Sequence, residues 1–425
     1  MTGLTICGVL NLDQSYCLVL AGGGTRGAYQ VGAWKALREL GIGISAVAGT
    51  SIGAINAAFV VQGEAERLEQ LYDDVEIGDV IETNAEIGEN KNLFNIGNIV
   101  RVARDFIKQK GFDNEPLKKL LRQNLDVHKI YASDVDFGMV TYSIKNNKPM
   151  EIFRKDIPEE EFINYLLASA CFPIYKAQKI GENTFLDGGL YDNMPINMMI
   201  KKGYKRFIVI ELPGRNVKRG LIRKDVSIKL IRPDEPLGGV FEFNRDRIKK
   251  NSKLGYLDTL RAFCALQGHR YYFRTQDFTG LLSRFTLQTI EGLEFAAYVY
   301  NMDRYQIYES DRFLAELLER HRKAEEQYLA VKKMTGITTM IKEYAKLKSL
   351  LSDDLILCFF AEKLAEEPYF NGMGDNMLLS DYIAAARAMV EISASRYVET
   401  EQENLTYKIQ HSGCIPTGTH PVIDS

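Results

Sequence analysis

Residues 16–63 read YCLVLAGGGTRGAYQVGAWKALRELGIGISAVAGTSIGAINAAFVVQG. The short apolar run that opens this stretch ends in glycines, and the residues after it place apolar side chains at helical spacing. The same order of strand, turn and helix repeats from Ile44 to Gly63, where a glycine is a plausible helix stop. Two consecutive repeats of this kind predict a βαβα unit with a parallel sheet.

The rest of the chain extends this unit and then changes character. The run RFIVIEL (206–212) has the β-branched composition of a buried parallel strand. The same domain is expected to be completed by VSIKLIRP (226–233), a long helix from about Phe241 to Gln267, and YYFRT (271–275). Strand signals cease from about Thr279, and amphipathic helical patterns follow. We therefore expect an α/β domain over residues 1–275 and a helical C-terminal extension of unknown role over residues 276–425.

Composition and charge exclude several classes of protein. The formal net charge of -3 offers no basic surface for nucleic acid, so we expect no nucleic-acid partner. Six scattered cysteines disfavour a zinc site and a disulfide framework and indicate a reducing, cytoplasmic location. The first residues lack a secretory signal, and no apolar stretch approaches the ~20 residues of a membrane span. Any membrane contact is then peripheral, at the inner face of the membrane.

The segment Gly49-Thr50-Ser51-Ile52-Gly53 fits the pattern Gly-x-Ser-x-Gly and lies between a predicted strand and a predicted helix. This is the position of a nucleophile elbow, in which small glycines let the chain reverse so that the serine hydroxyl projects from the turn. The same short pattern also arises by chance at helix caps and turns.

The loop Gly22-Gly23-Gly24-Thr25-Arg26-Gly27 also lies between a strand and a helix. Consecutive glycines let backbone N–H groups converge on an oxyanion, and a phosphate is the competing ligand. The spacing lacks the Lys and Ser/Thr of a P-loop. It satisfies the bare Gly-x-Gly-x-x-Gly of a dinucleotide site, but no acidic residue follows at the end of the second strand.

Asp187-Gly188-Gly189 is the third element, and Asn193 and Pro195 follow it. An aspartate with two glycines behind it can approach another strand's turn without obstruction by side chains. A tight turn is the alternative explanation for this tripeptide.

Taken together, the three elements resemble the patatin-like phospholipase family over roughly residues 16–211. The segment Ala168-Ser169-Ala170-Cys171-Phe172-Pro173 is similar to one that commonly precedes the family's aspartate. The resemblance implies a three-layer α/β/α fold with a mostly parallel central sheet. It also implies a Ser–Asp dyad, with Ser51 as nucleophile and Asp187 as base, and an oxyanion hole from the amides of Gly22, Gly23 and Gly24. Arg26 falls on the family's basic position and steadies that loop or a phosphate.

The family suggests a phospholipid or lysophospholipid substrate, cleaved as a carboxylic ester through an acyl-serine, with no metal and no cofactor. None of the five histidines lies in a strand-end motif, which agrees with a dyad. The alternative is a phospholipase effector acting on bacterial membranes, regulated by a signal or partner through the C-terminal helices. A non-catalytic lipid-binding scaffold is the third possibility. The oligomeric state is unknown from the sequence.

Two further expectations concern the substrate. The apolar helices between Leu93 and Leu125, with Met194, Met198 and Met199, line an acyl-chain cleft or belong to the core. A basic segment either contacts anionic headgroups or forms a solvated loop. Its charged residues are Arg215, Lys218, Arg219, Arg223 and Lys224, with Leu221 and Ile222 between them.

Overall fold

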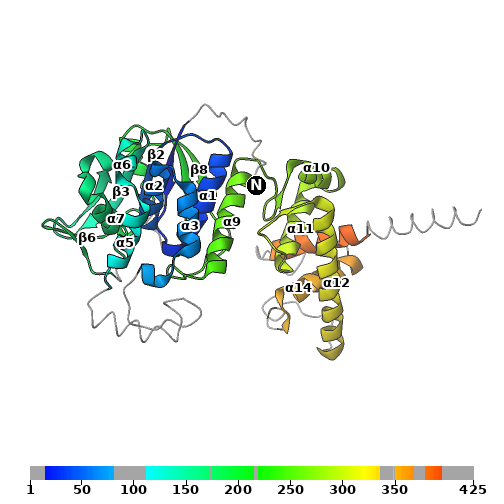
Figure 1. Cartoon of the computed structure of the whole chain (residues 1–425). Coiled ribbons are helices and arrows are strands. Elements are labelled where there is room, and N and C mark those ends of the chain that lie inside the picture. The colour runs from blue at the N-terminus through cyan, green and yellow to red at the C-terminus, as the bar shows by residue number, and fades with distance from the viewer. Residues whose placement is uncertain are drawn as a thin grey trace, which may run out of the picture. The chain divides into compact units, whose positions relative to one another are not determined.

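The computed structural model describes residues 15–80, 112–172, 175–214, 219–335, 348, 350–367 and 379–394. The chain divides into two compact units, Met1–Leu266 and Gln267–Ser425 (Figure 1). No helix within the described ranges combines the length and the apolar character that crossing a membrane requires.

The first unit is built on one sheet with the strand order β5-β6-β3-β2-β1-β7-β8, and β4 pairs with β3 beside this path. The strands are β1 (Tyr16–Leu20), β2 (Ile44–Thr50), β3 (Asp136–Ser143), β4 (Lys148–Phe153), β5 (Gln178–Ile180), β6 (Asn183–Asp187), β7 (Arg206–Ile210) and β8 (Ser227–Ile231). The central strands β3, β2, β1, β7 and β8 pair in parallel, whereas β4, β5 and β6 are antiparallel to their neighbours. The predicted α/β class with a mostly parallel central sheet is confirmed.

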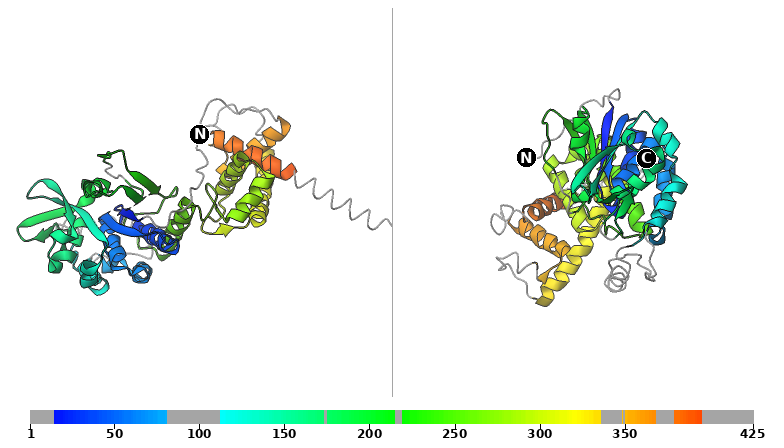
Figure 2. Two further views of the ribbon diagram at one scale, coloured as in Figure 1. Left: turned by 90° about the horizontal axis from the view of Figure 1, so that it is seen from above. Right: turned by 90° about the vertical axis from the view of Figure 1, so that its left-hand side faces the viewer.

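Helices cover this sheet, and those near the N-terminus lie together beside α9 (Figures 1 and 2). They are α1 (Ala28–Glu39), α2 (Ile52–Gln62), α3 (Ala65–Asp74), α5 (Glu115–Asn124), α6 (Val127–Ala132), α7 (Phe162–Ser169), α8 (Ile196–Lys201) and α9 (Arg245–Ala262). Cys17 and Val19 alternate with Leu18 along β1, and they share a buried cluster with Met198 and Met199 of α8. Because successive strand residues point to opposite faces, α8 packs on one face of the sheet and leaves Leu18 for the other.

One edge of β3 is shared by two strands. β2 pairs with residues 136–140 of β3 and ends at Thr50, which lies opposite Val140. β6 pairs with residues 141–143 and ends at Asp187, which lies opposite Thr141. Because β4 occupies the other edge of β3 over residues 138–143, β2 and β6 must meet end to end on the same edge. The ends of these two strands are therefore neighbours in space.

The second unit contains the C-terminal helices that the sequence predicts. They are α10 (Thr275–Arg284), α11 (Leu287–Val299), α12 (Ser310–Thr335) and α14 (Asp353–Glu366), and residues 379–394 are also helical. A separate cluster of buried apolar side chains, including Phe273, Leu293 and Phe360, joins them.

YYFRT lies in the second unit and does not complete the first domain as expected. β9 (Tyr272–Phe273) pairs in parallel with β10 (Ile307–Tyr308), a strand that the sequence did not suggest. Phe273 is buried in the core of the second unit, where its ring contacts those of Tyr308 and Phe313. The compact units accordingly divide after Leu266, nearer the N-terminus than the boundary expected at residue 275.

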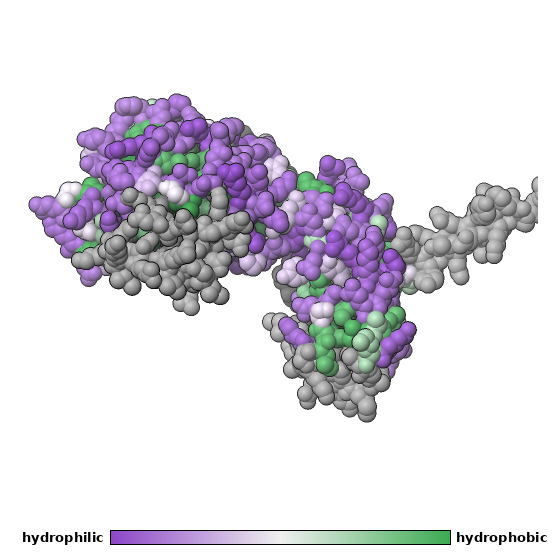
Figure 3. Space-filling view, turned by 60° about the horizontal axis from the view of Figure 1, so that its bottom comes forward, coloured by the Kyte–Doolittle hydropathy of each residue, from purple (hydrophilic) through white to green (hydrophobic). Residues whose placement is uncertain are grey.

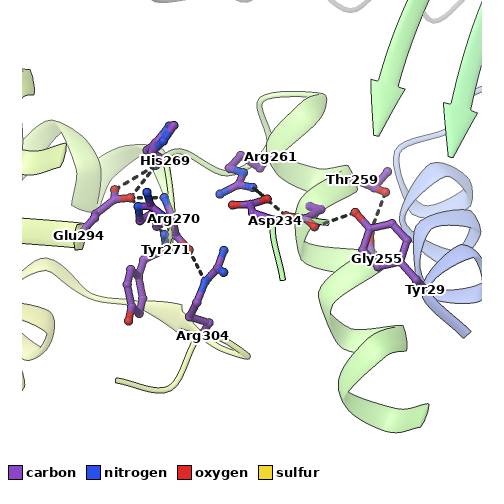
Figure 4. A network of polar contacts seen from close by, with 11 residues as sticks. Tyr29, Asp234, Gly255, Thr259, Arg261, His269, Arg270, Tyr271, Glu294 and Arg304 are labelled. Carbon is purple, nitrogen blue, oxygen red and sulfur yellow. Dashed lines mark hydrogen bonds and ion pairs between the residues drawn. The ribbon is translucent and has the colours of Figure 1, made fainter. Parts of the chain in front are cut away.

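Buried polar contacts hold each unit internally (Figure 4). In the first unit Tyr29 of α1 donates a hydrogen bond to Asp258 of α9 over 2.7 Å. In the second unit the fully buried Glu294 accepts hydrogen bonds from the backbone N–H groups of His269, Arg270 and Tyr271. Such converging amides satisfy a carboxylate that burial would otherwise make costly. Glu294 therefore fixes the start of the second unit onto α11.

The cysteines differ in state. Cys17, Cys171 and Cys358 are buried free thiols, whereas Cys264 is disulfide-bonded. The scattered spacing along the sequence did not indicate this bond.

Helices α1 and α9 pack so closely that glycine is required on both. A methyl group added at Gly255 would lie 1.9 Å from the carbonyl oxygen of Tyr29, and one added at Gly32 would lie 1.7 Å from that of Ser252. Elsewhere in a helix alanine would be more stable than glycine. At Gly32 and Gly255, however, an added methyl group would overlap the facing helix and force the two helices apart.

We predict that Gly255→Ala lowers the free energy of unfolding by about 2 kcal/mol, because overpacking exceeds the gain in helix propensity. Urea unfolding of the full chain measures the change. Gly78→Ala is the control, since a methyl group there meets no atom within 4 Å and leaves stability nearly unchanged. Equal stability of the wild type and Gly255→Ala would show that the helices can separate without cost.

Candidate active site

Ser51 occupies a backbone conformation that few residues other than glycine adopt. It lies between β2 and α2 with φ 56° and ψ -129°. A non-glycine residue at positive φ persists only where the surroundings enforce it, and such residues gather at functional sites. Gly49 and Gly53 make the turn possible, since a methyl group at either would lie 2.2 Å from a backbone carbonyl oxygen, that of Gly53 or Leu20 respectively. The turn thus has the geometry expected of a nucleophile elbow.

Asp187 carries a buried carboxylate beside this turn. The residue is 4% exposed, and its Oδ1 accepts a hydrogen bond from the backbone N–H of Gly189 over 2.7 Å. Its Oδ2 is buried and has no hydrogen-bond partner among the described residues. Burial raises the pKa of Asp187 to about 6, against the opposing effects of the Ser51 hydroxyl and the Gly189 amide. The Ser51 hydroxyl is the side-chain group that lowers this pKa, so it lies beside the carboxylate.

The glycines after Asp187 allow this approach. A methyl group at Gly188 would lie 2.1 Å from the carbonyl oxygen of Val140, so only glycine lets the turn pass β3 at this distance. At Gly189 the added group would lie 3.0 Å from Oδ1 of Asp187. Both residues of the predicted aspartate turn therefore keep the carboxylate against β3.

The Gly22–Gly24 loop lies against the same site, but its three amides differ. The side chain of Asn193 accepts from the Gly22 N–H over 3.2 Å and donates to the Gly22 carbonyl over 3.1 Å. Gly22 is therefore not a free oxyanion donor, because its amide is already paired; this part of the prediction is corrected. Within the described residues, the N–H groups of Gly23 and Gly24 donate no hydrogen bond.

Arg26 holds the glycine loop from its other side. Its guanidinium donates to the carbonyl oxygens of Gly238 and Pro213 over 2.8 and 2.6 Å. Thr25 adds a backbone hydrogen bond to Val240 over 2.9 Å. We call the segment Leu237–Phe243 the strap. Partial burial lowers the pKa of Arg26, with Glu242 acting in the opposite direction.

Helix α9 begins later in the chain than the sequence predicts. The sequence predicts a helix from about Phe241, whereas α9 begins at Arg245. Asn244 caps the helix by accepting a hydrogen bond from the Arg247 amide over 2.9 Å. Phe241 and Phe243 precede the cap and face the site instead.

The sequence analysis assigned no role to two supporting groups, the Ser169 hydroxyl and the amide pair of Asn56 and Gln30. The Ser169 hydroxyl accepts from the Ser51 N–H over 3.1 Å and donates to the Val140 carbonyl over 2.7 Å, so it ties the elbow to β3. Asn56 donates to Gln30 over 2.9 Å, and Gln30 donates to the Ala21 carbonyl over 2.7 Å, just before the glycine loop. The signal for Asn56 was its position as a lone amide in the apolar run of α2.

These groups surround a cavity of about 540 Å³, within the range of small-molecule sites. Ser51, Asp187, Gly22, Gly23, Gly24, Arg26 and Gly189 line it, so the structure brings the predicted residues together. Apolar side chains supply most of the remaining wall: Ile52, Ile55, Leu71, Val75, Leu117, Leu120, Leu121, Phe172, Leu190, Phe241, Phe243 and Ile248.

The expected acyl-chain cleft is thus only partly as predicted. Leu117 and Leu121 of α5 line the cavity, whereas residues 93–111 of the predicted segment lie outside the described residues. Met198 and Met199 belong to the buried core beneath the sheet, and Met194 packs against it. The core alternative is therefore correct for the methionines.

The histidines that the structure describes do not belong to the cavity wall. Of the three described histidines, His128 pairs with Glu159, His269 lies in the second unit, and His321 contacts Tyr300 there. None lines the cavity. In the parts of the chain that the structure describes, no three His, Cys, Asp or Glu residues gather as a metal site.

The raised pKa of Asp187 predicts a stability effect. A carboxyl group whose folded pKa of about 6 exceeds its ordinary value of 3.8 stabilises the folded state fully below pH 3.8, and this contribution is lost as pH rises through 6. Asp187→Asn removes the ionisation. We compare the free energy of unfolding of Asp187→Asn with that of the wild type. We expect this difference to shift in favour of the variant by about 2–3 kcal/mol between acid and neutral pH.

Urea unfolding of both proteins on either side of pH 6 measures this difference. Asp225→Asn is the control, because the Asp225 carboxylate is exposed and paired with Arg223. A difference between wild type and Asp187→Asn that does not vary with pH would contradict the burial argument.

Part of the chain is similar to a known protein family. The sequence model of the patatin-like phospholipase family matches residues 18–200. Lysophospholipase nte1 of Aspergillus terreus is 60% identical over 45 residues, which are 11% of this chain and 3% of that protein. The uncharacterized protein YqhO of Bacillus subtilis is 25% identical over 247 residues, covering 54% of this chain and 79% of that one.

Among solved structures, VipD from Legionella pneumophila aligns over 93% of this chain and 88% of its own, with 12% identity and a TM-score of 0.40. The ExoU–SpcU complex of Pseudomonas aeruginosa aligns over 92% of this chain and 77% of that one, with 17% identity and a TM-score of 0.34. The family-model match spans the Gly-rich loop, the Ser51 turn and Asp187. Residues 18–200 thus match the patatin-like phospholipase family, as the sequence motifs predict.

Proposed function

We propose that this protein hydrolyses carboxylic esters of lipids, of the phospholipase A or lysophospholipase type, with Ser51 as nucleophile and Asp187 as general base. The observation that carries the proposal is the meeting of a strained serine turn and a buried, half-satisfied carboxylate at the wall of an apolar cavity. The match of residues 18–200 to the patatin-like phospholipase family supports the same chemistry.

In the first step Ser51 Oγ attacks the acyl carbonyl carbon, and its proton passes to Asp187. The free oxygen Oδ2 is the acceptor that the geometry favours, since Oδ1 already accepts from Gly189. The carbonyl oxygen becomes an oxyanion. We assign its stabilisation to the unpaired amides of Gly23 and Gly24 and to the positive end of α2.

The tetrahedral intermediate then expels the alcohol, which takes the proton from Asp187, and an acyl-Ser51 ester remains. A water molecule then attacks the acyl-Ser51 ester by the same steps. Asp187 accepts the proton of the water, the oxyanion forms again, and the Ser51 oxygen leaves and takes that proton. Ester and water are thereby converted into a fatty acid and an alcohol. Asp187 acts as base and then as acid in both halves.

Burial tunes Asp187 for this role. A surface aspartate is a weak base, whereas a carboxylate with a pKa near 6 binds a proton more strongly and is still mostly ionised at neutral pH. Desolvation is the main cause, so the apolar surroundings of the site contribute directly to its basicity.

The wall of the cavity favours a long acyl group over a small polar one. Leu117, Leu121 and Ile55 present only apolar surface, and Phe172 and Phe241 pack ring edge against ring face at 5.6 Å. Burial of an alkyl chain against such side chains stabilises binding in proportion to its area. A phospholipid or lysophospholipid presented by a membrane, with peripheral contact at its cytoplasmic face, is the substrate we propose.

The regulated alternative and the role of the second unit stay predictions. The third possibility, a non-catalytic scaffold, has less support, because the strain at Ser51 and the unpaired oxygen of Asp187 would serve no purpose there.

We predict that Ser51→Ala and Asp187→Asn each lower kcat by about 10³-fold or more, and that the double variant is no worse than either, because the two groups act as a unit. The assay is incubation with mixed phospholipids and lysophospholipids, followed by mass spectrometry of the products. Ser283→Ala, an exposed serine in α10, is the control and keeps full activity. Ser51→Ala activity within tenfold of the wild type would exclude the acyl-serine route.

The pH dependence supplies a second prediction. Only ionised Asp187 accepts a proton, so kcat/KM for a soluble ester rises with pH, reaches half its maximum near pH 6 and is constant above it. Burial also raises the pKa of Asp192 to about 6, so that residue must be separated from Asp187. Asp192→Asn keeps the inflection if Asp187 is the base. Loss of the inflection in Asp192→Asn would show that Asp192, and not Asp187, is the group that titrates.

A further inference from the structure

Residues 219–224, which we call the tip loop, expose two large aliphatic side chains in succession. Leu221 is 42% exposed and Ile222 is 53% exposed. Single exposed apolar residues are ordinary, and on the face drawn in Figure 3 the first unit shows separate hydrophobic areas among mostly hydrophilic residues. Two adjacent exposed aliphatic side chains in a basic loop indicate a site where contact with an apolar surface would be favourable.

The backbone of the tip loop is fixed rather than loose. The side chain of Asn197, at the start of α8, donates to the Gly220 carbonyl over 2.9 Å and accepts from the Ile222 N–H over 3.0 Å. Asn197 is only 7% exposed, so this bridge is shielded from water. Because the bridge holds the chain on both sides of Leu221, the fold itself imposes the exposure of the aliphatic tip.

Cationic groups surround the aliphatic pair. Arg219 lies 4.0 Å from the ring centroid of Tyr191 and attracts the buried Asp192. Arg223 is bound by both oxygens of Asp225. Lys224 is exposed and has no ion pair among the described residues. Arg215 and Lys218 of the predicted basic segment lie outside the described residues. Over residues 219–225, three cationic side chains accompany one carboxylate, a composition that suits an anionic surface.

The tip loop also contacts a segment that borders the active-site cavity. Tyr191, on which Arg219 stacks, follows Leu190, which is 52% exposed and lines the cavity. Phe172 is 37% exposed and lines it as well. Contact of the tip loop with a lipid surface would therefore bring that surface to the cavity.

We propose that the tip loop docks this protein on anionic lipid bilayers by inserting Leu221 and Ile222 among the acyl chains while Arg219 and Lys224 contact the headgroups. A lipid surface fits better than a protein partner, since a stable protein interface needs roughly 1,200 Å² or more. Short apolar insertions flanked by cations suffice for reversible membrane binding. The inference deepens the proposed function by naming how the site reaches its substrate, but it is tested by binding alone.

The test uses the full chain carrying Ser51→Ala, so that hydrolysis cannot alter the vesicles. Flotation with vesicles of phosphatidylcholine and phosphatidylglycerol measures affinity, with pure phosphatidylcholine as the second arm. We expect Leu221→Ser combined with Ile222→Ser to lower affinity about tenfold or more on mixed vesicles. Arg219→Gln combined with Lys224→Gln lowers it on mixed vesicles only, and added salt weakens the wild type in the same way. Ile144→Ser, 45% exposed between β3 and β4, is the matched control and binds as the parent does.

Equal affinity of the double serine variant and its parent, or no vesicle binding by the parent, would overturn the proposal. A change in oligomeric state without a change in vesicle binding, seen by size-exclusion chromatography, would assign the tip loop to a protein contact instead. In the active protein the double serine variant keeps its rate on a soluble ester and loses rate on vesicles. If nothing is hydrolysed but the binding pattern holds, the proposed function fails and the docking surface stands.

Discussion

The sharing of one edge of β3 by β2 and β6 is the constraint on which the site depends. Thr50 ends β2 opposite Val140, and Asp187 ends β6 opposite Thr141, so the next residue after Thr50 must turn away beside the carboxylate. A parallel strand and an antiparallel strand can meet end to end only if both chains leave the sheet at once. The positive φ of Ser51 and the close packing of Gly188 against β3 are how they do so.

A second layer of contacts fixes the glycine loop against this junction. Asn193 pairs with both backbone groups of Gly22, and Arg26 reaches carbonyl oxygens of the strap and of Pro213. These anchors come from different regions of the chain, and the strap lies beyond the residues that match the family model. Fixed amides at Gly23 and Gly24 need no reorganisation when charge develops, which is the condition for electrostatic stabilisation of an oxyanion. The strap therefore belongs to the proposed site as much as the motif residues do, and its phenylalanines also enclose the cavity.

Desolvation connects the cavity to the chemistry. The apolar side chains that would receive an acyl chain also exclude water from Asp187, and exclusion of water is the main cause of its raised pKa. Substrate binding and base strength thus have one physical origin. The cost is a buried group with one unpaired oxygen, which the rest of the fold must stabilise.

Short-range pattern determined much of this in the sequence alone. Strand–glycine–helix repeats predicted the parallel sheet, and glycines around Ser51 and after Asp187 predicted tight turns, because backbone sterics act over a few residues. Helical periodicity likewise predicted the C-terminal helices. The tertiary structure decided what depends on distant partners. Gly22 pairs with Asn193, so only the amides of Gly23 and Gly24 remain for an oxyanion. The methionines lie in the core, and β9 pairs with β10. Hydrogen bonding and burial between residues far apart in the chain leave no local signal, so only the folded chain reveals them.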